Sequence, residues 1–288
     1  MGLASYPASL RRDLWLAALF ALGVMAVMLI LYGPAIGTMD FRDGDDALRL
    51  VQVRDLIAGQ SWFDTSQHRI NPPTGGLMHW SRLIDVQIAG LILLLEPLLG
   101  RAAAEQWAAA LYPPMLLLPL FLILAIVMRR LSDDRAVVAA GLALAATTMT
   151  FLHYFVPLRI DHHNWQTILS VLMLAIALGK PDARHGLFAG VAMGLHLAIS
   201  LEALPYLLIF GGIFALAWLR DPATGPRLFA FVATLAIGAP LLLLATRGWD
   251  GIMGDWCDAW SRPYLLGAAV AAAALLVGSR AAVVRQDW

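Results

Sequence analysis

The sequence contains few charged residues and a single cysteine. Charged residues make up 14% of its 288 positions and hydrophobic residues 60%. Soluble domains carry about 25% charged residues, so this chain lacks the charge that would cover a water-exposed surface. Cys257 alone cannot form an internal disulfide, and it excludes a cysteine-rich metal site. The formal net charge of zero gives no reason to expect nucleic acid as a partner.

The chain also lacks a low-complexity linker, a short repeat and a soluble domain. It has instead a series of apolar runs, most of them close to the ~20 residues that cross a bilayer. We expect an all-α polytopic transmembrane bundle of about eight spans, forming a single domain over residues 1–288, with the spans after the first inside 106–280. The candidate spans are 14–33, 106–128, 136–155, 165–179, 186–200, 203–219, 228–246 and 264–279.

Basic residues set the expected orientation. The first apolar run is followed by Gly33 to Gly37, which lacks the cleavage pattern of a signal peptide, so we expect an uncleaved first span. Lysine and arginine in short loops mark the cytoplasmic side. If the spans alternate, one side holds Arg11, Arg12, Arg129, Arg130, Arg135, Lys180, Arg184, Arg220, Arg227, Arg280 and Arg285. We therefore expect a multi-pass protein of the bacterial inner membrane with a cytoplasmic N-terminus.

One further apolar stretch, residues 83–100, is left out of these spans. It carries Asp85, Gln87 and Glu96, and counting it would move the Arg129–Arg135 cluster to the outer side. We interpret it as a helix lying in the outer interface or buried against the bundle. The alternative is an ordinary span, with another span miscounted. Two segments then face the periplasm: a long loop over 34–105, which we expect to carry interfacial helices, and a short turn over 159–164.

The long loop opens with a cluster of four acids, Asp40, Asp43, Asp45 and Asp46. Divalent cations or cationic groups relieve the repulsion in such a cluster, and hard oxygen ligands suit Mg²⁺ or Mn²⁺. The alternative is a solvated loop in which Asp45 or Asp46 caps a helix over 47–58.

The short turn contains Asp161, His162 and His163, which are natural metal ligands in an otherwise apolar protein. In an extended turn Asp161 and His163 would grip one cation, and His162 would point elsewhere. The alternative is a polar cap, with Asp161 beginning the helix that starts near Asn164. Both the turn and the acid cluster are predicted on the outer face, where together they would form a Lewis-acid site.

Residues 61–82 mix aromatic, proline, glycine and basic residues. Such a loop can place aromatic faces against a sugar and basic groups against phosphate. The alternative is a turn-rich loop that packs on the bundle.

The order of these features resembles the catalytic subunits of oligosaccharyltransferases, members of the C-type glycosyltransferase superfamily. Asp43 and Arg49 have that family's spacing after the first span. The matching segments that follow are Phe63-Asp64, Pro73-Thr74-Gly75, Trp80 to Asp85, Tyr112-Pro113-Pro114, Arg129-Arg130-Leu131 and Asp161-His162-His163. The branch that uses polyprenyl-phosphate sugars is also similar, through Gly59 to Trp62 and Pro72-Pro73, so the branch stays open.

The resemblance implies an inverting glycosyltransferase. It would move a sugar or oligosaccharide from a polyprenyl-phosphate or -diphosphate carrier to a glycan, lipid or protein acceptor on the periplasmic face. Asp43, Asp161 and His163 would hold a divalent cation, Mn²⁺ or Mg²⁺. Asp43, Asp45 and Asp46 are the candidate catalytic acids. The candidate substrate-binding residues are Arg49, His79, Trp80 and Arg82.

The sequence departs from the family in three places. Gln166 stands where an acid is usual, a later external-loop glutamate has no counterpart, and the family's soluble C-terminal domain is missing. The alternative function is therefore a catalytically incomplete or non-enzymatic membrane subunit or transporter with the same fold, and a partner chain could complete the site. Charge concentrated at the outer face, rather than deep in the spans, favours surface chemistry over transport.

Overall fold

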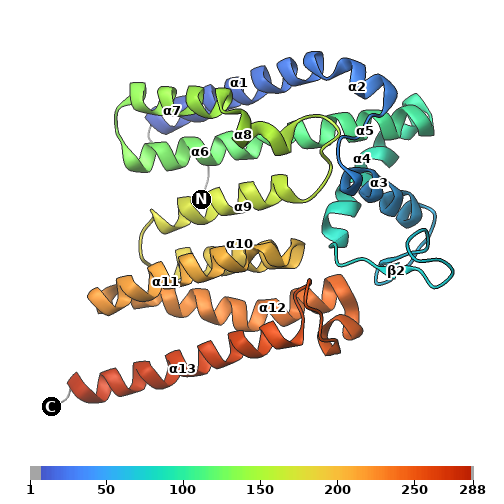
Figure 1. The fold of residues 1–288 in the computed structure, drawn as a ribbon. Coiled ribbons are helices and arrows are strands. Elements are labelled where there is room, and N and C mark those ends of the chain that lie inside the picture. The colour runs from blue at the N-terminus through green and yellow to red at the C-terminus, as the bar shows by residue number, and fades with distance from the viewer. Residues whose placement is uncertain (1–7, 287–288) are drawn as a thin grey trace. The chain divides into compact units, whose positions relative to one another are not determined.

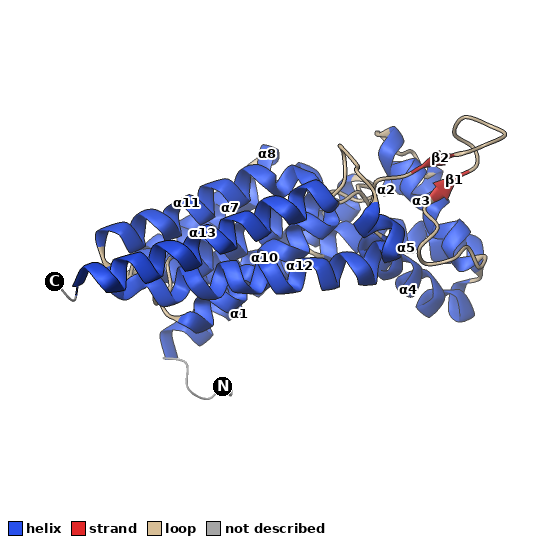
Figure 2. Cartoon of the chain, turned by 90° about the horizontal axis from the view of Figure 1, so that it is seen from below, coloured by secondary structure: helices blue, strands red, loops and turns tan. Residues whose placement is uncertain are grey.

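The computed structural model describes residues 8–286, with side chains described over 10–275. Almost all of the described chain is helical, and one pair of short strands interrupts it (Figure 2). The chain divides into two compact units, Met1–Gly76 with Arg82–Ala175 and Leu77–Ser81 with Ile176–Trp288. In Figure 1 the first unit runs from blue to yellow-green and the second from yellow to red. The side chains of Arg280 and Arg285, used above for orientation, lie outside the described ones.

The first unit is built on α1 (Ala8–Leu31), which packs against α6 (Leu117–Leu131) and α7 (Arg135–Thr147). Small residues allow a close approach, since Ala17 and Ala21 of α1 are fully or almost fully buried. At the N-terminal end of α1, the Asp13 carboxylate lies 2.6 Å from Nη2 of Arg129 on α6. This ion pair joins α1 to α6 at the end of the unit where the basic cluster Arg129–Arg135 lies.

The long loop folds into helices rather than open coil. After α1 come α2 (Gly33–Thr38) and α3 (Gly44–Ile57), then the paired strands β1 (Ser66–Gln67) and β2 (Gly76–Leu77), then α4 (Arg82–Leu99). Gly100 has φ +75°, a conformation that glycine adopts at little cost, and it joins α4 to α5 (Arg101–Met115). The helices α3, α4 and α5 pack together and form the platform of the candidate site.

A sharp bend ends the third apolar segment. α7 stops at Thr147, and α8 (Met149–Leu152) with the 3₁₀ turn η2 (His153–Phe155) leaves at 67° to it. The chain then passes through residues 156–162 and enters α9 (His163–Ala177).

The second unit contains α10 (Ala183–Ile199), η3 (Leu201–Ala203), α11 (Leu204–Arg220), η4 (Pro222–Thr224), α12 (Gly225–Met253) and α13 (Arg262–Gln286). Its tightest packing is between α10 and α12. Gly186 lies against the backbone oxygen of Arg227, and a Cβ on Gly190 would come within 2.5 Å of Cβ of Thr234. Glycines spaced four residues apart let two apolar helices touch backbone to backbone, so they set how close α10 and α12 lie.

The structure supports fewer spans than expected. Among the residues that the structure describes, four helical segments are long and apolar enough to cross a membrane, or five with the bent α7–α8 pair. They are Leu10–Leu31, Arg101–Leu131, Leu201–Arg220 and Pro222–Met253. The expectation of about eight is not supported, because α9 has 15 residues and α10 has 17. At 1.5 Å per residue these helices measure roughly 22–26 Å, less than the ~30 Å hydrocarbon core.

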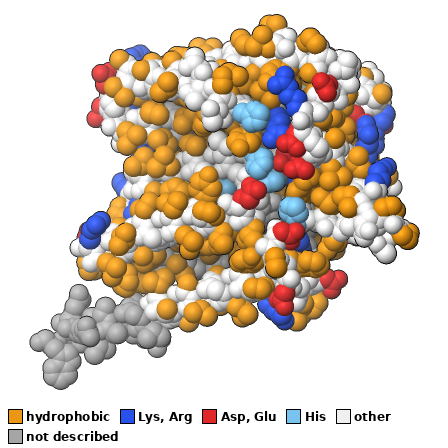
Figure 3. Space-filling view, viewed as in Figure 1, with side chains coloured by type: hydrophobic (Ala, Val, Ile, Leu, Met, Phe, Trp, Pro, Cys, Tyr) orange, Lys and Arg blue, Asp and Glu red, His pale blue; other side chains and the backbone are white. Residues whose placement is uncertain are grey.

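The remaining differences concern α13 and α4. Within the described side chains the predicted span 264–279 is a shorter apolar helix, Arg262–Leu275. The 83–100 stretch forms α4, which carries Arg82, Asp85 and Glu96 and is not among the spans. Apolar length and composition identify a membrane protein. In Figure 3 hydrophobic side chains cover most of the first unit's visible face, and many of its charged side chains lie toward the ends of the helices.

The close packing of α10 on α12 predicts a position-dependent effect of adding a methyl group. Gly186→Ala should lower the free energy of unfolding by about 1–3 kcal/mol, because the new Cβ overlaps the Arg227 carbonyl. Gly194→Ala is the matched control on the same helix, since its Cβ would meet Leu235 at 4.0 Å, an ordinary contact. Thermal unfolding of both variants in detergent measures the difference, and equal unfolding temperatures would contradict this packing.

Candidate functional site

The acid cluster is organised by the first turn of α3. Asp43 has extended backbone angles, φ −127° and ψ 137°, and its carboxylate accepts a hydrogen bond from the Asp45 amide at 3.1 Å. Asp43 is therefore the N-cap, not Asp45 or Asp46, because the helix begins at Gly44, three residues earlier than expected. Asp45 is exposed and Asp46 is fully buried, and both lie in the first turn, where the helix dipole favours negative charge.

Arg159 joins this helix start to the short turn. Its Nη1 lies 2.6 Å from Oδ2 of Asp43 and 2.9 Å from Oδ2 of Asp46. The backbone amide of Asp161 donates to Oδ1 of Asp46 at 3.0 Å. Two residues of the short turn are thus fixed to carboxylates more than a hundred positions away in the sequence.

The two carboxylates respond differently to this contact. Burial raises the pKa of Asp46 to about 6, against the opposing effects of the Arg159 charge and the Asp161 amide. The pKa of Asp43 is lowered, first by the hydrogen bond from Arg159 and then by that from the Asp45 amide. Asp43 therefore stays ionised at neutral pH and pairs with Arg159.

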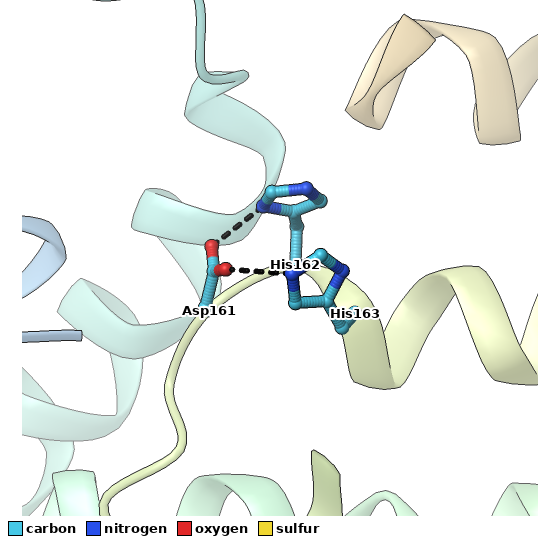
Figure 4. A group of neighbouring side chains, drawn as sticks. All are labelled: Asp161, His162 and His163. Carbon is cyan, nitrogen blue, oxygen red and sulfur yellow. Dashed lines mark hydrogen bonds and ion pairs between the residues drawn. The ribbon is translucent and has the colours of Figure 1, made fainter. Parts of the chain in front are cut away.

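Asp161 is the centre of the candidate site (Figure 4). Its side chain is almost fully buried, and Oδ1 lies 2.5 Å from Nδ1 of His162 and 3.2 Å from Nη2 of Arg49. Its Oδ2 faces Nε2 of His163 at 3.4 Å. Burial alone would raise the pKa of Asp161, but the His162 hydrogen bond and the charges of His162 and Arg49 outweigh burial and hold this pKa well below its usual range. The carboxylate is therefore ionised.

The expectation that His162 points elsewhere was wrong. Both imidazole rings turn toward the same carboxylate, and one donor atom each from Asp161, His162 and His163 lies within 4.8 Å of the others. The chain is not extended here. The Gln166 amide donates to the His162 carbonyl at 3.2 Å, so His162 is the residue immediately before α9 and accepts the helix's first hydrogen bond. Neighbouring side chains diverge by about 100° on a helix rather than alternating across a strand.

The Asp161 and His163 atoms are spaced as two ligands of one cation would be. Two donors bound to one cation at ~2.0–2.2 Å lie roughly 3.4 Å apart in tetrahedral geometry and roughly 3 Å apart in octahedral geometry. Oδ2 and Nε2 are 3.4 Å apart, so an octahedral Mn²⁺ or Mg²⁺ would draw them slightly closer. Nδ1 of His163 lies 2.8 Å from Oε1 of Gln166. In the tautomer that donates to Gln166, Nε2 presents its lone pair toward Oδ2, and a cation between the two atoms is favoured. The donor set therefore fits a divalent metal.

Buried arginines fix Asp161 from behind. Arg49 and Arg82 have no exposed side-chain surface, and both bind the buried carboxylate of Asp85, at 2.9 and 3.0 Å. Nη2 of Arg82 also donates to Oε1 of Gln60 at 2.7 Å and to the Asp64 carbonyl at 2.5 Å. One chain of contacts thus connects Asp161 through α3 and α4 to the loop before β1.

The structure brings together some of the predicted site residues and not others. Asp46, Arg49, Arg82 and Asp161 belong to one buried network, and Asp43 joins it through Arg159. Asp43 is outside the group of three possible metal ligands.

His79 and Trp80 belong to the second unit. There Nδ1 of His79 lies 3.6 Å from Oδ2 of Asp258, Arg247 donates to the His79 carbonyl, and Trp80 is buried.

Sequence reasoning missed the roles of Arg159 and Asp85. Arg159 stands two positions before Asp161, and an arginine in an apolar segment needs a carboxylate partner. The four-acid cluster needs positive charge, so these two requirements together are the signal for their contact. Asp85 has one local signal, Arg82 three residues before it on the same helix, but nothing in its local sequence indicates the contact with Arg49.

Comparisons with known proteins give a fold likeness only. No family model matches the chain, and no curated protein matches it. Among solved structures, it is similar to the crystal structure of the Archaeoglobus fulgidus oligosaccharyltransferase in complex with zinc and sulfate. The TM-score is 0.60 at 18% identity over 88% of this chain. The match covers 35% of that protein, so this chain spans about a third of its length. The fold is therefore oligosaccharyltransferase-like.

The buried network predicts that substituting two arginines of α3 will lower the stability of the protein by different amounts. Arg49→Met should lower the free energy of unfolding by about 3–5 kcal/mol, because Asp85 and Asp161 lose their shared counterion inside the protein. Arg54→Met is the matched control, since Arg54 is about half exposed, pairs with Glu105, and should cost less than ~1 kcal/mol. Denaturant or thermal unfolding compares them, and a small effect of Arg49→Met would refute the role given to this pair.

Proposed function

We propose that this chain is an inverting glycosyltransferase that moves a sugar or oligosaccharide from a polyprenyl-phosphate or -diphosphate carrier to an acceptor. The observation that carries the proposal is the ionised Asp161 carboxylate with His163 placed beside it at the spacing of two cation ligands. The likeness to an oligosaccharyltransferase fold supports the same reaction class.

Asp161 and His163 are the proposed holders of a divalent cation, Mn²⁺ or Mg²⁺. A nitrogen ligand beside a carboxylate suits Mn²⁺ better than Mg²⁺, which prefers oxygen alone. The bound cation would neutralise the charge of the carrier's phosphate as the sugar leaves. Asp43 stays a proposed third ligand. It would have to exchange its contact with Arg159 for one with the cation.

We propose two different roles for the three acids at the N-terminal end of α3. Asp45 is exposed and Asp43 is partly exposed, so both are placed to orient an acceptor or to accept its proton. Asp46 is fully buried, and its carboxylate holds the turn by accepting from Arg159 and from the Asp161 amide. We therefore assign Asp46 to positioning Asp161 rather than to contact with substrate.

The four residues proposed for substrate binding also differ. Arg49 and Arg82 are fully buried, and we assign them to holding Asp161, Asp85 and the loop before β1. Trp80 is 4% exposed and serves packing in the second unit. The His79 side chain is 41% exposed and stays the proposed contact to the sugar or phosphate.

The proposed orientation places this site at the periplasmic face of a bacterial inner membrane. In the first unit the basic cluster near Arg129 lies at the N-terminal end of α1, where Asp13 meets it, while α3 follows the other end. Positive charge in short loops favours the cytoplasm, which leaves α3 and Asp161 outside.

A second candidate is a subunit whose activity needs a partner chain. It is favoured by one observation: Asp43, the proposed third ligand, is bound to Arg159 and lies outside the group of possible metal ligands. An assay of the purified chain distinguishes the enzyme from the subunit. It measures transfer of a radiolabelled sugar from a polyprenyl-diphosphate carrier, with and without Mn²⁺. Cation-dependent product supports the enzyme, and cation binding without product supports the subunit.

The proposed cation site predicts a loss of metal response in two variants. Mn²⁺ should raise the unfolding temperature of the wild type saturably, because it binds only the folded site. Asp161→Asn and His163→Ala should each remove that increase, since each deletes a ligand. His153→Ala, an exposed histidine of η2, is the matched control and should keep it. The readout is the difference with and without Mn²⁺, so a lower basal stability does not obscure it, and an unchanged increase in Asp161→Asn would reject the site.

The contact of Gln166 with His163 predicts a graded effect on cation affinity. Gln166→Leu should weaken Mn²⁺ binding about 10–100-fold, because Nδ1 of His163 loses the acceptor that fixes its tautomer. Gln166→Glu should restore or exceed wild-type affinity, since a carboxylate is the stronger acceptor. Calorimetric titration measures both, and equal affinities in the two variants would show that the contact has no role in binding.

A further inference from the structure

A single nitrogen atom of Arg159 is shared by two carboxylates of very different exposure. Nη1 lies 2.6 Å from Oδ2 of Asp43 and 2.9 Å from Oδ2 of Asp46. The Asp46 side chain has no exposed surface, whereas the Asp43 side chain is 43% exposed. Water competes with an ion pair at an exposed carboxylate, but it does not reach one in the interior. The contact with Asp43 is therefore the one that costs less to exchange.

The two oxygens of Asp43 have different partners. Oδ1 accepts the hydrogen bond from the Asp45 amide at the start of α3, and Oδ2 is the oxygen that meets Arg159. Asp161 is divided in the same way, since its Oδ1 is held inside the protein and its Oδ2 faces His163. If another group replaced Arg159 at Oδ2 of Asp43, the cap of α3 would stay intact.

The backbone around Arg159 is held by hydrogen bonds on both sides. The Leu158 amide donates to the Ala109 carbonyl of α5 at 3.0 Å, and Nδ2 of Asn164 donates to the Arg159 carbonyl at 3.3 Å. Leu158 has φ +70°, a left-handed conformation that a residue with a side chain keeps only where its surroundings hold it. The guanidinium can therefore leave Asp43 by a change of side-chain rotamer, without a movement of the turn.

We propose that Arg159 is a releasable latch that competes with the divalent cation for Oδ2 of Asp43. With the latch closed, as in the structure, Asp43 is bound to Arg159. With the latch open, Asp43 becomes the third ligand beside Asp161 and His163, while Arg159 keeps its buried contact with Asp46. This inference rests on the proposed function for the cation, and it adds a control of cation loading, because a competing contact lowers the apparent affinity of the site.

The test is the Mn²⁺ affinity of the purified full chain, measured by calorimetric titration. Arg159→Gln should bind Mn²⁺ about three- to fivefold more tightly than the wild type, because Asp43 no longer has to leave a guanidinium. Arg42→Gln is the matched control, since Arg42 is exposed and adjacent in sequence to Asp43 but lies over the Tyr32 ring. It removes the same charge and should change the affinity less than about twofold.

An Asp43→Ser background separates a latch from a residue that only holds the turn. Serine still caps α3, but it offers no carboxylate to Arg159 or to the cation. In that background Arg159→Gln should no longer tighten Mn²⁺ binding. Weaker binding by Arg159→Gln, a gain no larger than that of Arg42→Gln, or the same gain without Asp43 would overturn the latch. Each of these outcomes leaves the cation site of the proposed function standing.

A second variant decides the question if Arg159→Gln does not fold. Asp46→Asn keeps an acceptor for the Asp161 amide, but it removes the charge of one of the two carboxylates that hold Arg159. The latch should then close more tightly on Asp43, so Mn²⁺ binding should weaken about threefold, with no such loss in the Asp43→Ser background. No loss, or the same loss in both backgrounds, contradicts the latch.

The titrations use no sugar donor, so they judge the latch separately from the reaction. A chain in which the effect of Arg159 on Mn²⁺ affinity depends on Asp43, but which transfers no sugar, would overturn the proposed function and leave the latch standing. If neither the wild type nor Arg159→Gln binds Mn²⁺, the latch and the cation site are both wrong.

Discussion

The ion pair between Arg49 and Asp161 is the contact on which the rest of the first unit depends. Both groups are buried, and removing such charges from water costs several kcal/mol each unless every charge finds a partner. The partners are supplied by Asp85, Arg82, Asp46 and Arg159, so four carboxylates meet three guanidinium groups. The fourth carboxylate is Asp43, at the exposed edge. This network fixes the short turn to α3 and α4.

The two oxygens of Asp161 have separate tasks. Oδ1 is used inside the protein by Arg49 and His162, while Oδ2 turns to His163, whose side chain is about a quarter exposed. A carboxylate held in this way stays ionised and cannot rotate away, which preorganises one oxygen for a ligand. The proposed glycosyl transfer would use this arrangement, with Asp161 and His163 holding the cation that neutralises the carrier's phosphate.

The sequence predicted the parts of this arrangement that depend on local composition. Apolar runs and few charges indicated an all-α membrane protein, and the order of motifs from Asp43 and Arg49 to Asp161-His162-His163 resembled an oligosaccharyltransferase, whose fold the structure shares. The number of spans was overestimated, because apolar runs as short as 165–179 and 186–200 were counted as spans, and the helices that form there, of 15 and 17 residues, fall short of the ~20 that cross a bilayer. The prediction for His162 was wrong because it assumed an extended turn. The chain already turns into α9 at His162, so its ring points toward Asp161. Arg159 was missed because Asp43 and Asp46 lie 116 and 113 positions away, and the link from Asp85 to Arg49 was missed because it spans 36 positions.

The central claim is that Asp161 and His163 hold one divalent cation. Electron–nuclear double resonance of Mn²⁺ bound to the purified chain tests it most directly, because it detects a nitrogen atom coordinated to the metal. The account predicts a nitrogen coupling in the wild type that disappears in His163→Ala and persists in His153→Ala. Bound Mn²⁺ with no nitrogen coupling, or a coupling that survives His163→Ala, would contradict it.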